Sequence, residues 1–208
     1  MSLLDHLGLV WAAWARVGSS LTDEQWAAPT RLPGWAVVDV YAHHSAFPGA
    51  IATIATSPAA DAPMTHAGAS ALLAMFNAPN GPAHTMSDVV RDRAVALARE
   101  RSTSDLVAEF EVTAARATEV ASSVRLDQPI DYGGVAVLAF GEALRIALLE
   151  AVVHYLDLAR ALDLPVPGPV VGEPLRATAA LLAEVADPVV FVERATGRSD
   201  VEVLPVIR

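Results

Sequence analysis

Apolar residues recur at helical spacing along most of the chain, and proline and glycine separate the apolar segments. The first segment covers residues 3–18, where Gly18 ends the pattern. Thr22 and Gln25 then form the signature of a capping box that opens a short helical turn. The longest segment, residues 139–162, combines apolar stretches with a line of polar side chains. Each of these segments predicts a helix.

Further helices are expected between these segments and after them. The stretch PTRLPGW, residues 29–35, carries two prolines and a glycine and therefore predicts a rigid loop. Before the longest segment we expect a helix over 36–56 that contains Pro48 and Gly49, a long connection over 57–85 with one helical turn, and a helix over 87–101 capped by Ser87. A helix from Thr103 or Ser104 to 122 and a turn over 126–134 with a short extended piece should follow. A last helix is expected over 174–186. Strand signals are few, so the pattern predicts an all-α antiparallel bundle with one long crossover.

Composition narrows the choice of partners and compartment. The chain has 208 residues, of which 53% are hydrophobic, and a mean hydropathy of +0.40, so we expect a sizeable core. A net charge of −10 disfavours nucleic acid and anionic membranes as partners. No apolar run is long enough to span a bilayer, and no basic stretch precedes the first apolar segment. A cytoplasmic protein is therefore expected.

Cysteine is absent from the sequence. This excludes disulfides, thiolate metal ligands and a nucleophilic cysteine. Any thiol chemistry would need a thiol that comes from solution.

Three polar residues stand on one line of the predicted 139–162 helix: Glu150, His154 and Asp157. At about 100° per residue, their side chains fall within about 60° of one another, so a carboxylate and an imidazole project in parallel one turn apart. Both groups are normal zinc ligands. The alternative interpretation is the solvated face of an amphipathic helix, because a Glu–His pair at this spacing is also a common surface feature.

A metal site needs a third ligand. The candidates are His6, His43, His44, His66 and His84. His43 is the best placed, because Ala36, Val40 and Phe47 share its helical stripe and would bury it in the bundle, where such sites are built. The alternative for His43 is a hydrogen-bonded core residue. His44 points about 100° away from His43, and His66 and His84 lie in the long connection.

Two aspartates are candidates for orienting the histidine ligands. Asp39 lies one turn before His43, and Asp157 lies one turn after His154, so each could accept a hydrogen bond from the ring nitrogen that does not face the metal. Ordinary surface charge is the alternative for both. Three protein ligands would leave a tetrahedral zinc with one open position, which suits catalysis more than structure. A water or thiol bound there would lose its proton to the metal.

The motifs together resemble a known family. The segments LTDEQWAAPTRLPGWAVVDVYAHH and RIALLEAVVHYLDLARAL are similar to the N-terminal domain of mycothiol-dependent maleylpyruvate isomerases, which belongs to the DinB-like superfamily of four-helix bundles. The residues that carry the resemblance are Leu21, Thr22, Trp26, Leu32, Pro33, Gly34, Trp35, Val37, Asp39, Val40, His43, Glu150, His154 and Asp157. The ending TGRSDVEVLPVIR is similar to that of short family members, so the resemblance covers nearly the whole chain.

The resemblance implies a DinB-like metal-binding bundle over residues 1–165, and a short C-terminal helical extension over 166–208 that packs on it. It also implies a divalent metal, with zinc as the first choice, held by His43, Glu150 and His154, and mycothiol as a co-substrate. The chain departs from the family at two points. The residues after Pro165 are too few for the further α/β domain of the isomerases, and His44 replaces an apolar residue. We therefore expect metal binding, rather than maleylpyruvate isomerisation itself, to carry over.

Two functions are consistent with these observations. In the first, the protein is a mycothiol-dependent metalloenzyme of the transferase or isomerase type, in which the thiol adds to a small electrophilic molecule. In the second, it is a non-catalytic protein of the same fold that binds a small ligand or forms a homodimer, and its metal is structural or vestigial. Thiol-dependent turnover would separate the two.

Overall fold

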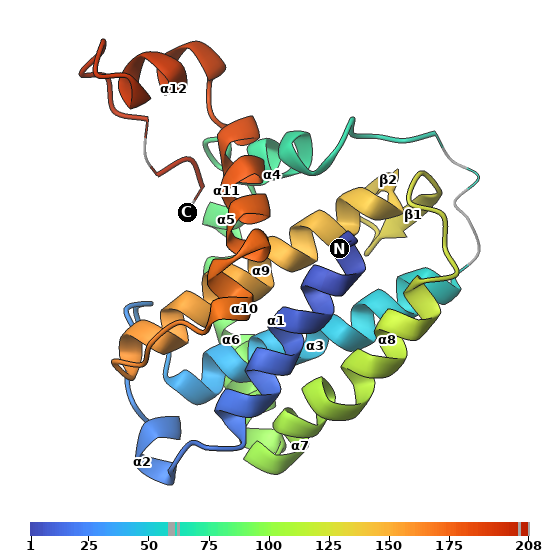
Figure 1. The fold of residues 1–208 in the computed structure, drawn as a ribbon, viewed down its shortest axis with the longest axis vertical. Coiled ribbons are helices and arrows are strands. Elements are labelled where there is room, and N and C mark those ends of the chain that lie inside the picture. The colour runs from blue at the N-terminus through green and yellow to red at the C-terminus, as the bar shows by residue number, and fades with distance from the viewer. Residues whose placement is uncertain (58–60, 62, 204, 208) are drawn as a thin grey trace.

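Four long helical segments pack as a bundle in the computed structural model, which describes residues 1–57, 61, 63–203 and 205–207 (Figure 1). The four are α1 (Leu3–Gly18), α3 (Val37–Thr56), the continuous α7 (Thr103–Ala108), η1 (Glu109–Thr113) and α8 (Ala114–Ala121), and α9 (Phe140–Ala161). The expected all-α bundle is confirmed. The order is not a simple up-and-down one, however, because α3 and α8 run in the same direction and α9 returns antiparallel to α3 (Figure 1). The long crossover between α3 and α7 allows this order.

Aromatic side chains from α1 and α3 form the centre of the core. Trp11, Trp14 and Tyr41 are almost completely buried, as is Phe140 at the start of α9. The indole N–H of Trp14 donates to the backbone carbonyl of Ala151 at 3.0 Å, and the hydroxyl of Tyr41 donates to the carbonyl of Trp14 at 2.9 Å. Each of these polar groups is therefore buried with a partner, as a well-packed interior requires. The bonds fix α1 against both α3 and α9.

The first part of the crossover, residues 57–85, is more helical than the sequence pattern predicts, because it contains α4 (Ala69–Asn77) and α5 (Pro82–Thr85). Helix α6 (Ser87–Glu100) matches the helix expected over 87–101, and it lies along α3. Ala94 is the single buried residue of α6, so this helix covers the bundle from outside. At the start of the crossover, Thr65 exchanges hydrogen bonds with Val137, which joins it to the hairpin described next.

A β-hairpin leads into α9 where the sequence indicates a turn. Strand β1 (Pro129–Tyr132) pairs antiparallel with β2 (Ala136–Ala139), with Tyr132 opposite Ala136. Gly133 and Gly134 connect them with φ values of +64° and +74°, a backbone conformation that glycine adopts without strain. The hairpin closes one end of the bundle (Figure 1).

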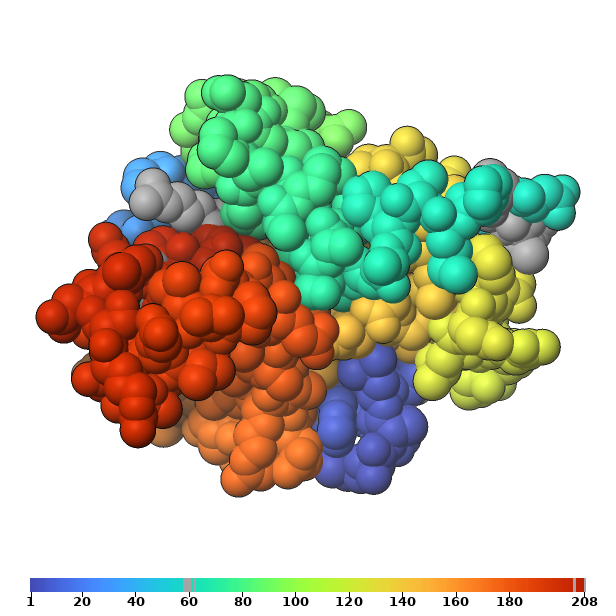
Figure 2. Space-filling model, turned by 90° about the horizontal axis from the view of Figure 1, so that it is seen from above, coloured from blue at the N-terminus to red at the C-terminus, as the bar shows by residue number. Residues whose placement is uncertain are grey.

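The C-terminal residues form α10 (Gly168–Val171), α11 (Glu173–Val185) and α12 (Pro188–Ala195). Helix α11 packs against α9 and α4, and Figure 2 shows the C-terminal segment beside the crossover. Helix α12 has no counterpart among the elements expected from the sequence, although Asp187 caps it by accepting from the backbone of Val189 and Val190. Asp followed by Pro is a recognised helix-start signal. The boundary at residue 165 between bundle and extension stays a prediction.

Of the three helix caps that the sequence predicts, one is correct and two are wrong. Thr22 and Gln25 form the expected capping box at the start of α2 (Asp23–Trp26). Helix α7, in contrast, is capped by Ser102, whose hydroxyl accepts from the backbone of Asp105, and not by Thr103 or Ser104. Ser87 is the first residue of α6 and does not cap it. Among the described helices, none combines the length and apolarity that crossing a membrane requires.

Candidate metal centre

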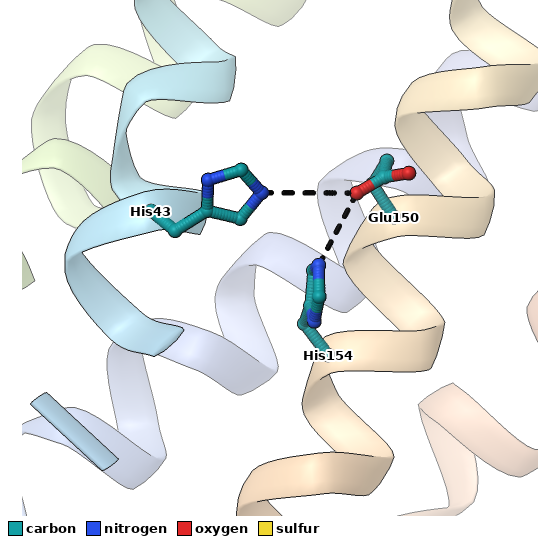
Figure 3. A group of neighbouring side chains, drawn as sticks. All are labelled: His43, Glu150 and His154. Atoms are coloured by element: carbon teal, nitrogen blue, oxygen red, sulfur yellow. Dashed lines mark ion pairs between the residues drawn. The ribbon is translucent and has the colours of Figure 1, made fainter. Parts of the chain in front are cut away.

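His43, Glu150 and His154 converge at the contact between α3 and α9 (Figure 3). Nε2 of His154 lies 3.2 Å from Oε2 of Glu150, and Nε2 of His43 lies 3.9 Å from the same oxygen. One ligand atom from each residue falls within 4.8 Å of the other two. In the part of the chain that the structure describes, this is the one such group of three residues.

The helical positions explain why these side chains meet. Glu150 and His154 are four residues apart on α9, so they project from the same face one turn apart. His43 comes from the face of α3 that is packed on α9, and its ring stands edge-on to that of His154 with 5.1 Å between centroids. The structure therefore brings together two residues that are neighbours on one helix and a third that is more than a hundred positions away in the sequence.

The spacing of the three ligand atoms fits a divalent metal. Ligand atoms around a tetrahedral zinc with bonds of about 2.1 Å stand about 3.4 Å apart, close to the two separations given above. Two imidazoles and one carboxylate are a donor set that zinc accepts. The three side chains are between 17% and 26% exposed, so an ion and a further ligand can reach them from solvent. The residues present could hold a metal ion, and they leave a coordination position open.

Asp157 supports His154 from behind, as the sequence analysis expects. Oδ2 of Asp157 lies 3.0 Å from Nδ1 of His154, and an ionised carboxylate is an acceptor, so Nδ1 donates. Asp157 is 2% exposed, which removes the alternative that it is ordinary surface charge. With its proton on Nδ1, the neutral ring presents the lone pair of Nε2 to the site.

Arg31 completes this line of contacts, and sequence reasoning missed it. Its Nε donates to Oδ1 of Asp157 at 2.6 Å, from a loop that precedes α3. A single arginine in a loop carries no periodic signal, and its partner lies 126 residues away. The nearest signal is its place within the PTRLPGW motif of the rigid loop.

The structure overturns the role expected for Asp39. Its Oδ2 accepts from the backbone N–H of Ala36 at 2.8 Å, where it satisfies a free donor at the start of α3. The carboxylate thus faces the helix start instead of His43. The position one turn before His43 could not separate these two uses, because the third residue of a helix is also a capping position.

The other histidines lie outside the cluster. His44 is completely buried between the rings of Trp14, Phe47 and Phe110. Nδ1 of His66 lies 2.9 Å from the hydroxyl of the neighbouring Thr65, and Nε2 of His84 lies 3.3 Å from the carbonyl of Asn77, while His6 is on α1. His43 is therefore the histidine that joins Glu150 and His154, as expected.

Opposite charges in the cluster shift the pKa values of its members. Burial alone raises the pKa of Glu150, but the nearby imidazoles of His154 and His43 outweigh it and hold this pKa well below its usual range. Burial alone lowers the pKa of His154, but hydrogen bonds to Asp157 and Glu150 outweigh it and raise the pKa to about 9. At neutral pH the metal-free site is thus a carboxylate beside an imidazolium.

Aromatic side chains surround the cluster. Trp35 and Phe47 both stand edge-on to the His43 ring, with centroids at 5.6 and 5.8 Å. Burial, assisted by the negative charge of Glu150, raises the pKa of Tyr132 on β1 to about 12, so its hydroxyl keeps its proton. These rings give the polar cluster a largely apolar surround, which strengthens the electrostatic interactions inside it.

Comparison with known proteins agrees with this architecture. The model of the family described as "Mycothiol maleylpyruvate isomerase N-terminal domain" matches residues 7–159. The crystal structure of the mycothiol-dependent maleylpyruvate isomerase superposes with a TM-score of 0.55 at 14% identity, covering 86% of this chain and 68% of that chain. A mutant of that isomerase gives the same values. At this identity the structural likeness supports the fold alone, and no curated protein matches.

Proposed function

The chain belongs to the mycothiol maleylpyruvate isomerase N-terminal domain family, and from this premise we propose that it is a divalent-metal enzyme that uses a low-molecular-weight thiol, with zinc and mycothiol as the first candidates. The observation that carries the proposal is the convergence of His43, Glu150 and His154 from two helices at metal-ligand spacing. The substrate class is a small electrophilic molecule, and the reaction is thiol addition or transfer.

The charge of the ligand set favours an anionic thiolate as the fourth ligand. A divalent ion with two neutral imidazoles and one carboxylate keeps a net positive charge at the open position. Asp157 does not change this balance, because Arg31 faces it. When bound, the metal supplies a Lewis acid that lowers the pKa of a coordinating thiol. The chain has no cysteine of its own, so that thiol comes from solution.

The protein's own residues supply orientation and control of protons. His43 and His154 are fixed by aromatic contacts and by Asp157, so the ligand geometry exists before binding. When a thiol adds to an electrophile, a bond forms between sulfur and carbon, and the proton that leaves the thiol is later returned to the product. The Tyr132 hydroxyl, which keeps its proton beside Glu150, is a group that can donate to a developing negative charge.

The test combines metal analysis with thiol dependence. Protein purified without added metal should contain close to one divalent ion per chain. After exchange for cobalt, mycothiol should produce a sulfur-to-metal charge-transfer band, because soft sulfur displaces water. Glu150→Ala should weaken or remove this band, whereas His84→Ala, on the crossover, should retain it. No spectral change with mycothiol, together with no thiol-dependent rate for several electrophiles, would favour the non-catalytic alternative.

A further inference from the structure

The loop of residues 30–35, here called the rim loop, contacts His43 directly and is linked to His154 through Asp157. Through Trp35 it packs edge-on against His43, with an interplanar angle of 83°. Through Arg31 it holds Asp157, which in turn holds His154. One short segment therefore reaches ligands on two different helices.

Hydrogen bonds within the rim loop hold its backbone, and with it the base of Arg31, in a fixed position. The hydroxyl and the backbone N–H of Thr30 both donate to the carbonyl of Trp35 at 2.9 Å, and the N–H of Trp35 donates to the carbonyl of Leu32 at 3.1 Å. Gly34 takes a φ of +82°, which a side chain would strain. A backbone crossed by so many bonds over six residues allows Arg31 little freedom at its base.

Arg31 and His154 each donate a hydrogen bond to a different oxygen of the buried Asp157 carboxylate. Oδ1 of Asp157 accepts from Arg31, and Oδ2 accepts from His154. Because a carboxylate is planar, fixing one oxygen fixes the direction of the other. Arg31 is the only cation in the described residues that forms an ion pair with Asp157 apart from His154 itself. Its removal would leave a buried carboxylate with one partner and freedom to rotate.

We propose that Arg31 is a positioning residue of the metal centre, which acts through Asp157 to keep the Nδ1 proton of His154 hydrogen-bonded and its Nε2 directed at the metal. The proposal rests on the proposed metal-binding function, and it adds a residue that touches neither metal nor substrate. A lysine could supply the charge, but it lacks the planar guanidinium that approaches the carboxylate through Nε.

The first test compares zinc affinity by chelator competition in the wild-type protein and Arg31→Gln. Loss of a group that orients a histidine ligand through its hydrogen-bonded partner weakens metal binding about 10–100-fold, and we expect a change of that order. Arg31→Lys should recover part of it. The matched control is Arg125→Gln, which removes an arginine–aspartate pair of equal length on a surface turn and should not change the affinity. Unchanged affinity in Arg31→Gln would overturn the proposal.

A second readout separates positioning from general stability. In metal-free wild-type protein, the Nδ1 proton of His154 should give a downfield NMR signal that exchanges slowly with solvent. Arg31→Gln should lose this protection while the rest of the spectrum stays folded. If the protected signal remains and only the melting temperature falls, Arg31 has a structural role and the proposal is wrong. This arm needs no metal, so it stays informative even if the wild-type protein fails to bind zinc.

A double-mutant cycle checks the route through Asp157. If Arg31 acts through this carboxylate, then Arg31→Gln should have little further effect on zinc affinity in an Asp157→Asn background. Equal fold-losses in both backgrounds would show that Arg31 acts by another route and would refute the proposed mechanism. Should Asp157→Asn fail to fold, the comparison of the glutamine and lysine variants at Arg31 still decides.

Discussion

His43 and His44 are neighbours in the sequence but belong to two different environments. The side chain of His43 is 23% exposed and faces a carboxylate and a second imidazole across the α3–α9 contact. The ring of His44 is fully buried against Trp14 and Phe110, and neither of its nitrogens has a hydrogen-bond partner among the described residues. One residue of rotation along a helix thus separates a candidate ligand from a core residue.

This comparison shows that the presence of a histidine in the sequence does not by itself identify a metal site. Burial, followed by the nearby His154 and His43, lowers the pKa of His44 well below its usual range, so this ring is neutral. Phe110, on which it stacks, belongs to the π-helical turn η1, where the backbone of the third bundle segment widens. His44 behaves as a planar core side chain, whereas His43 has the charged Glu150 and His154 among its neighbours.

The largest expected difference between the two histidines is in metal content. His43→Ala should remove most of the bound metal, because two ligands on one helix hold a solvated ion weakly. His44→Leu should retain close to one metal per chain. Elemental analysis of both variants after gel filtration provides the measurement, with His84→Ala as a further control. Full metal content in His43→Ala would contradict the assignment across the two helices.

The second prediction concerns pH and His154. Its pKa of about 9 in the metal-free protein means that a metal must displace a proton at neutral pH. Metal affinity should therefore fall about tenfold for each pH unit below 9 through this residue alone, or about 100-fold from pH 8 to pH 6. The positive charge of protonated His154 also stabilises the metal-free fold. This stabilisation is fully present below about pH 6.5, and it is lost as the pH rises through the folded-state pKa of about 9.

Titration with zinc in a competing chelator at several pH values measures this dependence. A histidine with the reference pKa of about 6.5 would leave the affinity flat between pH 7 and 8.5, so a flat profile would contradict the raised pKa. His44→Leu should give the same profile as the wild-type protein, because a ring that is neutral throughout takes up no proton.

The third prediction is that His44→Leu is neutral or stabilising. The buried N–H of the imidazole has no partner in the part of the chain that the structure describes, and an unsatisfied buried polar group costs about 1–3 kcal/mol. Leucine has a similar volume, so we expect the free energy of unfolding to rise by up to about 1 kcal/mol after the loss of ring stacking is subtracted. Chemical denaturation of the metal-free proteins measures it. A loss of more than about 2 kcal/mol would indicate that one of the nitrogens has a buried water as a partner.

The sequence predicted those parts of the site that depend on a single helix. The spacing of Glu150, His154 and Asp157 places them on one face whatever the helix packs against, so both the pair and its supporting carboxylate could be foreseen. The choice of His43 over His44 needed only the apolar stripe on α3 and the resemblance to the family.

The features that could not be predicted depend on tertiary contacts, or on a sequence position that suits two different structural roles. The partner of Arg31 is distant in the sequence, and nothing in the loop motif indicates it. Asp39 stands at a position that suits both a helix cap and a partner for His43, and the cap forms. Residues 57–85 show little periodicity because alanine, proline and glycine are frequent there, so the sequence indicates a connection with one helical turn, although tertiary packing makes 69–77 and 82–85 helical.

The smallest expected effect concerns Phe47, which contacts both histidines. Its ring lies 5.8 Å from that of His43 and 5.0 Å from that of His44, so it separates the polar cluster from the core. Phe47→Leu keeps an apolar side chain but removes two ring contacts, and should lower the free energy of unfolding by about 1 kcal/mol. Zinc affinity should change by less than about threefold, since contact with Phe47 is only one of the constraints on His43. Denaturation and chelator competition on the same samples measure the two effects.

A tenfold loss of zinc affinity at unchanged stability would contradict this prediction. Phe47 would then be one of the groups that orient His43, and it would belong to the metal centre and not to the boundary between the environments of His43 and His44.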